Sequence, residues 1–227
     1  MRKTAIFDID GTIFRSSLLI EITEALIHKG IFPASARKVY ARAFSRWLDR
    51  RGPYENYINA VVEVFQKDLQ GMKKSEFMAV SKKVVALHKN RVYRFTRDLV
   101  KDLKKKNYFL LAISNSPKMI LDEFCRNLGF DKVYGRIFEA DKRGRFTGVT
   151  LYSELVSDKA KILKRAVEKE KLTLVKSIGV GDTESDIPML RLVDRPICFN
   201  PNEKLYRHAK RAGWEIRVER KDVIYRI

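Results

Sequence analysis

Two acidic residues near the amino terminus have the types and spacing for phosphate chemistry. Residues 8–12 read Asp-Ile-Asp-Gly-Thr after a short apolar run, so Asp8 and Asp10 are expected where a buried strand ends. Acids at i and i+2 suit a hard cation and a phosphate, because one can bind metal and attack phosphorus while the other handles protons. Gly11 permits the tight turn that directs backbone amides at the phosphate. Taken alone, the segment also fits an ordinary strand-end turn.

A second acidic motif follows another apolar run. Residues 181–186 read Gly-Asp-Thr-Glu-Ser-Asp, which again delivers a carboxylate, that of Asp182, at the end of a strand. Asp186 precedes an Ile-Pro pair and would serve equally well as the N-cap of a short helix. A capping role and a role beside a metal are compatible, so both acids are candidates for the metal site.

Two further positions are candidates for binding phosphate. Ser114 and Asn115 end a third apolar run before a predicted helix, and a helix N-terminus attracts anions. Either side chain could instead be a simple helix cap. Lys159 stands at the start of another predicted helix, where a cation opposes the helix dipole, and this indicates a compensating phosphate or carboxylate. In a chain so rich in lysine, a solvated side chain is the alternative.

These residues must be positioned by a sheet of buried strands that alternate with helices. Short apolar runs predict strands at 3–8, 108–114, 175–182 and 196–199. Helical patterns lie between them, at 95–106, 118–128, 158–171 and 203–212. This alternation predicts an α/β fold with a doubly wound, mostly parallel sheet. The glycines and alternation of residues 144–151 predict a small hairpin.

Residues 15–91 have a different texture, with apolar residues at helical spacing and no strand-like run. Breaks fall at 30–33, 52–53 and 71, which predicts an insertion of about four helices. Such a block cannot belong to the sheet, so we expect a helical cap above a catalytic core made of residues 1–14 and 92–227.

Bulk properties describe a globular chain with an unusual charge. It has 227 residues, 45% of them hydrophobic, and no run approaches the roughly 20 apolar residues that span a bilayer. The first residues do not resemble the apolar core of a signal peptide. Cys125 and Cys198 stand far apart in no metal-binding pattern, which predicts reduced thiols in a cytoplasmic protein.

The formal net charge is +19, which favours approach to phosphorylated substrates, nucleic acid or an anionic membrane. The excess is dispersed, so a generally basic proteome is the simpler interpretation. One local feature is a ridge formed by Lys38, Arg42, Arg46 and Arg50, spaced at i+4 on a predicted helix. It is either a solvated cationic face or a rim that steers anions.

In combination and order, the four motifs resemble the haloacid dehalogenase superfamily of phosphohydrolases, in its phosphoserine-phosphatase-like branch, subfamily IB. The resemblance covers residues 1–14 and about 92–227, and the insertion matches the helical cap of that branch only by its position and helical character. It implies a magnesium-dependent phosphatase that hydrolyses phosphate monoesters through an aspartyl-phosphate.

The resemblance also implies a role for each motif residue. Asp8 attacks the phosphoryl group, and Asp10 protonates the leaving alcohol and then activates water. Mg²⁺ is held by the Asp8 side chain, the Asp10 carbonyl oxygen and Asp182, with Asp186 acting through water. The phosphate oxygens are held by the remaining residues, which are Ser114, Lys159 and the backbone N–H of Asn115.

The cap departs from the phosphoserine phosphatases in its substrate residues. Those enzymes have a glutamate in the first cap turn, where this chain has Ser17, with Glu21 one turn further on. Residues 55–64 contain no basic residue to hold a substrate carboxylate. Phosphoserine is therefore one candidate and not the favoured one. The expected substrate is a small phosphorylated metabolite, with histidinol phosphate and other amino-alcohol phosphates as further candidates.

Two alternatives remain open. The chain could be a phosphatase of nucleic-acid ends or lipid head groups, as its charge would suit, although aromatic stacking platforms for nucleic acid are not apparent. It could also be a basic binding protein on an inactive phosphatase scaffold. The retention of Asp8, Asp10, Ser114, Lys159 and Asp182 argues against that second alternative.

Overall fold

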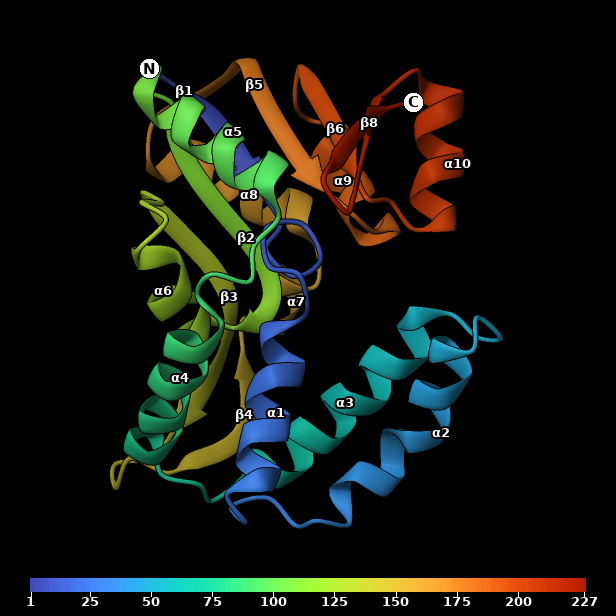
Figure 1. The fold of residues 1–227 in the computed structure, drawn as a ribbon. Helices are drawn as coiled ribbons and strands as arrows, with labels where there is room; N and C mark the ends of the chain where they lie inside the picture. The colour runs from blue at the N-terminus through green and yellow to red at the C-terminus, as the bar shows by residue number, and fades with distance from the viewer.

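The computed structural model describes all residues, 1–227, as an α/β protein built on one eight-stranded sheet (Figure 1). The strands are β1 (Arg2–Phe7), β2 (Phe109–Pro117), β3 (Lys132–Ala140), β4 (Phe146–Leu151), β5 (Leu172–Gly181), β6 (Arg195–Phe199), β7 (Glu215–Arg220) and β8 (Val223–Arg226). The helices are α1 (Leu18–His28), α2 (Ala36–Leu48), α3 (Tyr54–Leu69), α4 (Lys74–His88), α5 (Arg94–Lys105), α6 (Lys118–Arg126), α7 (Ser153–Val156), α8 (Lys159–Lys169), the short η1 (Glu184–Asp186), α9 (Ile187–Leu190) and α10 (Glu203–Ala212).

The strand order β4-β3-β2-β1-β5-β6-β7-β8 places β1 inside the sheet, between β2 and β5. Strands β1, β2, β3, β5, β6 and β7 pair in parallel, and only β4 and β8 are antiparallel to their neighbours. The predicted doubly wound, mostly parallel sheet is therefore confirmed. In such a sheet the carboxyl ends of β1, β2 and β5 meet at one edge, where ligands bind.

Both faces of the sheet are covered, which explains why its central strands are apolar throughout. In β1, Ala5 and Phe7 belong to one hydrophobic cluster while Ile6 between them belongs to the other. In β2, Leu111 and Ala112 divide in the same way. The larger cluster also contains apolar residues of α1, α3, α4, α5 and α6, and the smaller one those of α8, α9 and α10.

Between β1 and α5 the chain forms four helices, α1 to α4, whose breaks coincide with the glycine and proline positions at 30–33, 52–53 and 71. Helix α4 packs on α6, and α3 contacts β4. The antiparallel pair α2 and α3 projects to one side of the sheet (Figure 1). Residues 15–91 are proposed to be a cap on the core, and their apolar residues pack in the same hydrophobic cluster as those of the core strands. None of the helices is long and apolar enough to cross a membrane.

The hairpin predicted within residues 144–151 has different bounds. It pairs β4 with β3, so the alternation in that segment is that of a single strand. The turn lies before it, where the Asp141 carboxylate accepts hydrogen bonds from the backbone N–H groups of Arg143 and Arg145, both at 2.9 Å. Strands β3, β7 and β8 were not foreseen in the sequence.

Candidate active site

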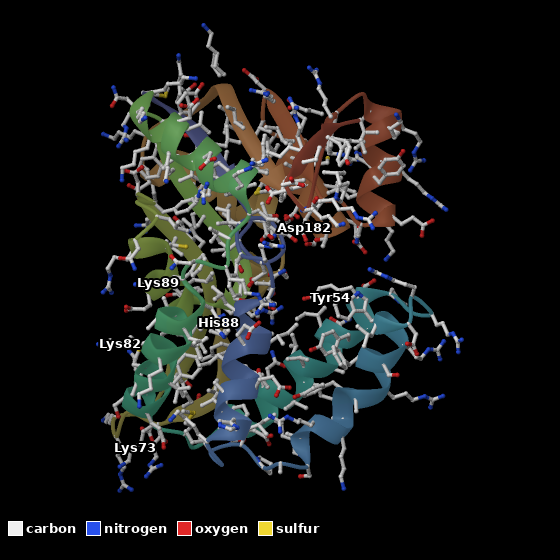
Figure 2. All side chains as sticks on the ribbon, viewed as in Figure 1. Tyr54, Lys73, Lys82, His88, Lys89 and Asp182 are labelled. Atoms are coloured by element: carbon white, nitrogen blue, oxygen red, sulfur yellow. The ribbon has the colours of Figure 1, made fainter.

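The carboxyl ends of β1 and β5 bring the two acidic motifs together. The backbone N–H of Asp8 donates to the Val180 carbonyl oxygen at 2.9 Å, which continues the pairing of β1 with β5 past the last residue of β1. The Thr12 hydroxyl lies 3.4 Å from Asp8 Oδ2 and 3.2 Å from Asp182 Oδ1, and it joins the two carboxylates. Asp182 is labelled in Figure 2 at this edge of the sheet.

Gly11 is required where the two motifs meet. Its φ is +78°, a left-handed conformation that other residues rarely adopt. A Cβ at this position would come within 2.1 Å of Asp182 Oδ2. Any side chain here would therefore displace the carboxylate of the second motif.

Lys159 is a buried cation between carboxylates, not a solvated residue. Its Nζ lies 2.6 Å from Asp8 Oδ1 and also pairs with Asp186, and the exposed fraction of its side chain is 5%. Burial alone would lower the pKa of Lys159, but Asp186 and Asp8 raise it above its ordinary value. Asp158 is the N-cap of helix α8, so it fixes Lys159 as the first residue of that helix. The unfavourable place of this lysine in the helix dipole is compensated by carboxylates.

Three carboxylates form a cluster that could hold a metal ion. Ligand atoms of Asp8, Asp182 and Asp186 lie within 4.8 Å of one another. Asp186 Oδ2 accepts from the backbone N–H groups of Asp182 at 3.0 Å and Thr183 at 3.1 Å. Asp186 is the N-cap residue of α9, as expected, but its side chain makes no capping bond there and holds the preceding loop instead. Hard carboxylate oxygens in this number suit a divalent cation of the magnesium or calcium type.

The cluster is electrostatically strained, because only one cation serves three acids. Burial, followed by the charges of Asp186 and Asp10, raises the pKa of Asp8 to about 7, although Lys159 acts in the opposite direction. Burial and the neighbouring carboxylates of Asp8 and Asp186 raise the pKa of Asp182 well above its ordinary value. A bound cation would relieve this repulsion, so the residues present fit a metal site.

Asp10 lies outside the three-carboxylate cluster and faces β2. Its Oδ1 accepts from the backbone N–H of Leu18 at 2.6 Å, and its Oδ2 accepts from the Ser114 hydroxyl at 2.5 Å. Burial raises the pKa of Asp10, while these two hydrogen bonds lower it. Asn115, the next residue of β2, has an exposed side chain. A raised pKa is what a group that carries a proton in catalysis requires.

Tyr54 and Tyr93 were not singled out in the sequence but lie near the acidic residues. The charges of Asp10 and Asp182 raise the pKa of Tyr54, after burial, and Asp182 does the same to Tyr93. Both tyrosines come from segments far from the motifs in sequence. The signal that could have found Tyr93 is its place at the return from the insertion to the core, whereas nothing local marks Tyr54.

The structure also shows the surroundings of Ser17 and Glu21, the two residues considered for the place of a substrate-binding glutamate. Ser17 is buried at the start of α1. Glu21 is engaged elsewhere, with Oε1 2.8 Å from Arg91 Nη1 and Oε2 3.3 Å from His88 Nε2. Glu21 is therefore engaged by Arg91 and His88, which lie near the carboxyl end of the insertion.

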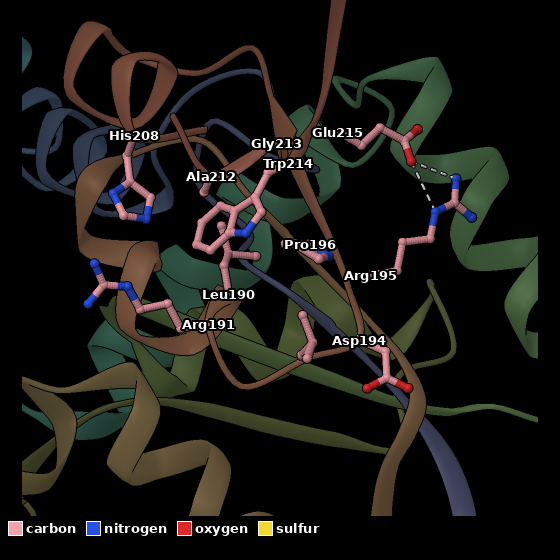
Figure 3. Close-up of a pocket in the computed structure, with 11 residues that line it drawn as sticks. Leu190, Arg191, Asp194, Arg195, Pro196, His208, Ala212, Gly213, Trp214 and Glu215 are labelled. Carbon is pink, nitrogen blue, oxygen red and sulfur yellow. Dashed lines mark hydrogen bonds and ion pairs between the residues drawn. The ribbon is translucent and has the colours of Figure 1, made fainter. Parts of the chain in front are cut away.

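A cavity of about 680 Å³ lies at another place on the core. Figure 3 shows Arg191, His208 and Trp214 around it, with Glu215 bound to Arg195. Helices α9 and α10 both end here, and cations are favourable at helix C-termini. Its charges therefore have a structural explanation, and none of the predicted site residues lines it.

Lys38, Arg42 and Arg46 of the predicted ridge are exposed on α2. Arg50 is also exposed but, contrary to the prediction, lies after the end of that helix at Leu48, in a left-handed conformation with φ of +61°. None of the four makes an ion pair. Arg37, next to the ridge, is instead paired with Glu24 at 2.8 Å. Four unpaired cations on one helix and the turn that follows it create a local positive potential, which salt screens.

Comparisons with known proteins agree with this geometry. The model of a family of haloacid dehalogenase-like hydrolases matches residues 5–191. A histidinol-phosphatase of Neisseria meningitidis is 26% identical over 224 residues, which cover 95% of this chain and 98% of that protein. A phosphoserine phosphatase of Mycobacterium tuberculosis is also 26% identical, over 96% of this chain and 71% of its own length.

A similar fold occurs in a solved structure. This is a phospho-aspartyl intermediate analogue of a phosphoserine phosphatase, with a TM-score of 0.61 and 19% identity. The match covers 97% of this chain and 95% of the other. At this identity the likeness establishes the fold, including the arrangement of strand ends at which the acidic residues lie.

Proposed function

Because the chain belongs to the haloacid dehalogenase-like hydrolases and is a phosphoric monoester hydrolase, we propose that it hydrolyses small phosphate monoesters with Mg²⁺ and through an aspartyl-phosphate on Asp8. The observation that carries this proposal is the place of Asp8. It lies at the end of the inner strand β1, in contact with Lys159 and in one cluster with Asp182 and Asp186.

Asp8, Asp182 and Asp186 are the side chains that would hold the metal, together with the carbonyl oxygen of Asp10. When bound, Mg²⁺ would offset the negative charge of the phosphoryl group and so permit the approach of a carboxylate. Lys159 contributes a fixed positive charge beside Asp8. These residues supply the charge stabilisation that dominates phosphoryl transfer.

In the first half-reaction an Asp8 carboxylate oxygen forms a bond to phosphorus while the bond from phosphorus to the alcohol oxygen breaks. Asp10 gives its proton to that oxygen. In the second half-reaction Asp10 takes a proton from water, whose oxygen attacks phosphorus and releases inorganic phosphate from Asp8. The raised pKa of Asp10 supports its role as the group that carries the proton.

Ser114 and Asn115 are proposed to receive the phosphate oxygens. In the structure the Ser114 hydroxyl donates to Asp10. It would have to turn to a phosphate oxygen when substrate binds, which would release the Asp10 carboxyl for the leaving alcohol. The same serine would then couple phosphate binding to the protonation step.

The substrate is proposed to be a small phosphorylated metabolite, with phosphoserine, histidinol phosphate and amino-alcohol phosphates as the first candidates. Names of the two relatives support the first two. A phosphate-release screen over these esters, phosphorylated lipid head groups and 5′- and 3′-phosphorylated oligonucleotides, each with and without Mg²⁺, separates the alternatives. Release without Mg²⁺ would contradict the proposed metal.

Asp8→Asn is the decisive variant, because it keeps the shape of the side chain and removes the nucleophile. We expect phosphate release to fall to background while the thermal melt remains cooperative. Equal release by this variant and the wild type would exclude the aspartyl-phosphate mechanism. No release by the wild type from any ester would favour a binding protein on an inactive scaffold.

A further inference from the structure

The amino-terminal end of α3 is tied to the metal-site loop by a chain of ion pairs. Lys204 Nζ lies 2.9 Å from Glu55 Oε2 and 2.7 Å from Glu184 Oε1. Glu55 belongs to the insertion and Lys204 to α10 of the core, while Glu184 stands between Asp182 and Asp186. This Glu55–Lys204–Glu184 bridge therefore connects α3 with the loop that carries two of the proposed metal ligands.

The core end of the bridge is well anchored. Glu184 also accepts a hydrogen bond from the Asn202 side chain, and the backbone N–H of Asn202 donates to the Asp182 carbonyl oxygen at 2.8 Å. These contacts fix the position of the Glu184 carboxylate beside Lys204.

The other end is open to solvent and correspondingly weak. The exposed fraction of the side chain is 62% for Lys204 and 55% for Glu55, against 28% for Glu184. Exposed ion pairs contribute little to stability and are screened by salt. The bridge therefore contributes little to the stability of the fold, and its proposed effect is limited to the orientation of the end of α3.

The residue that the bridge positions is Tyr54, which directly precedes Glu55 and begins α3. Figure 2 shows it at the end of α3 that faces Asp182. After burial, the Asp10 and Asp182 carboxylates raise the pKa of its phenol, while the Ser17 hydroxyl beside it acts in the opposite direction. The hydroxyl remains protonated at neutral pH and is available as a hydrogen-bond donor.

The ring of Tyr54 is held by aromatic neighbours. Its centroid lies 5.5 Å from that of Trp47 and 6.0 Å from that of Tyr57, both in edge-to-face contact. Such pairs fix the direction in which the phenol points. The ring of Tyr54 is thus packed against side chains of α2 and α3, and the next residue, Glu55, belongs to the bridge.

We propose that Tyr54 contacts the leaving alcohol of the substrate through its hydroxyl, and that the Glu55–Lys204–Glu184 bridge positions it against the core. This proposal rests on the proposed phosphatase function. Asp8 and Asp10 contact the phosphoryl group and the ester oxygen, so a side chain that faces them from the insertion meets the remainder of the substrate. A neutral phenol beside the Ser17 hydroxyl selects alcohols that carry a hydrogen-bonding oxygen or nitrogen near the ester.

The experiment compares Tyr54→Phe with the wild type on two esters. One is the polar alcohol phosphate that is hydrolysed best in the screen, and the other is para-nitrophenyl phosphate, whose leaving group offers no hydrogen-bonding group near the ester oxygen. Tyr54→Phe keeps the ring and its packing. The matched control is Tyr108→Phe, which removes a hydroxyl at the amino end of β2, where it donates to the Lys176 carbonyl oxygen.

We expect Tyr54→Phe to raise KM for the polar ester roughly 3- to 10-fold, as the loss of one hydrogen bond predicts, with little change for para-nitrophenyl phosphate. Tyr108→Phe should leave both KM values unchanged. Equal effects of Tyr54→Phe on both esters, or no effect on either, would overturn the assignment. Hydrolysis of para-nitrophenyl phosphate by the wild type tests the proposed function separately.

The bridge is tested with Lys204→Ala, and Lys210→Ala on the same helix is the control, because Lys210 is exposed and makes no ion pair. We expect Lys204→Ala to raise KM for the polar ester and to add little when combined with Tyr54→Phe, since both act on one contact. Full additivity of the two changes would show that the bridge does not act through Tyr54.

Discussion

At the scale of single residues, the site is organised by an imbalance of charge. Asp8, Asp182 and Asp186 form one cluster, and the one buried cation beside it, Lys159, pairs with Asp8 and Asp186. The carboxylates therefore repel one another, and burial penalises their charged forms. A folded protein that keeps such a cluster is less stable than it would be with neutral groups, and a bound divalent cation relieves the strain.

The first prediction concerns the pH dependence of stability in the absence of metal. The pKa of Asp8 is raised to about 7 in the folded chain, so the folded state keeps a proton that the unfolded state has lost. The stability contributed by this carboxyl is complete below about pH 4 and is lost as the pH rises towards about 7. Asp8→Asn cannot ionise, so its melting temperature should gain on that of the wild type across this range.

Thermal melts in EDTA check this prediction. Asp49→Asn, at an exposed position after α2, controls for the amide substitution itself. Excess Mg²⁺ should raise the melting temperature of the wild type more than that of Asp8→Asn, because the ion binds only the folded site. If the difference in melting temperature between Asp8→Asn and the wild type stays constant from pH 4 to 7, the pKa of Asp8 is not raised in the folded protein.

The motif residues were predictable because each stands directly beside a recognisable strand or helix. Lys159 was marked by its unfavourable position at a helix start, and the structure explains it by Asp8 and Asp186. Tyr54 and its bridge carry no such local signal. Glu55 and Lys204 are 149 residues apart, so their contact arises only from how α3 is placed on the core.

At the scale of elements, the helix α8 sets the position of its first residue, Lys159. Its N-cap is Asp158, whose carboxylate accepts from the backbone N–H groups of Ala160 at 2.8 Å and Lys161 at 3.4 Å. These bonds satisfy N–H groups that have no partner within the helix. The Asp158 cap therefore contributes both to stability and to the position of Lys159.

The second prediction is that Asp158→Ala lowers the free energy of unfolding by about 1 kcal/mol, the usual effect of removing an N-cap. Asp158→Ser keeps a capping oxygen and should recover most of the loss. Urea denaturation, with the slope required to stay constant, measures both variants. Equal destabilisation by Ala and Ser would mean that the Asp158 side chain is important for another reason.

The sequence predicted the inner elements better than the outer ones. Strands β1, β2, β5 and β6 are apolar on both sides because both faces of the sheet are covered. The outer strand β7 alternates instead, with Ile216 buried between the more polar Glu215 and Arg217. The sequence contains this alternation, but a short alternating segment does not by itself predict a strand when the strand that pairs with it is not known.

At the scale of the whole molecule, the insertion is attached to the core in two unequal ways. Apolar residues of α1 and α4 belong to the same hydrophobic cluster as β1 and β2, which fixes that side firmly. The end of α3 reaches the core through the exposed Glu55–Lys204–Glu184 bridge. Helix α3 also belongs to that cluster along its length, whereas α2 contributes only Ala36 and Tyr40. Motion of α2 is therefore easier than motion of the other three helices, because fewer buried contacts oppose it.

The last prediction concerns the charge of +19 and four exposed cations, Lys38, Arg42 and Arg46 on α2 and Arg50 just after it. Charges act over about 30 Å at 0.01 M ionic strength but only about 8 Å at 0.15 M. Replacement of all four by Gln should therefore lower kcat/KM several-fold at low ionic strength, through slower association with a phosphorylated substrate, and leave kcat unchanged. At high salt the variant and the wild type should converge.

A control must separate the ridge from net charge alone. Lys73, Lys82, Lys83 and Lys89 are exposed and make no ion pair, and Figure 2 shows the three labelled ones around α4, away from Tyr54. Their replacement by Gln removes the same charge from another surface. If both quadruple variants slow association equally, the field of the whole chain attracts the substrate. A larger loss for the α2 variant assigns the attraction to the helix that packs beside α3 and its Tyr54.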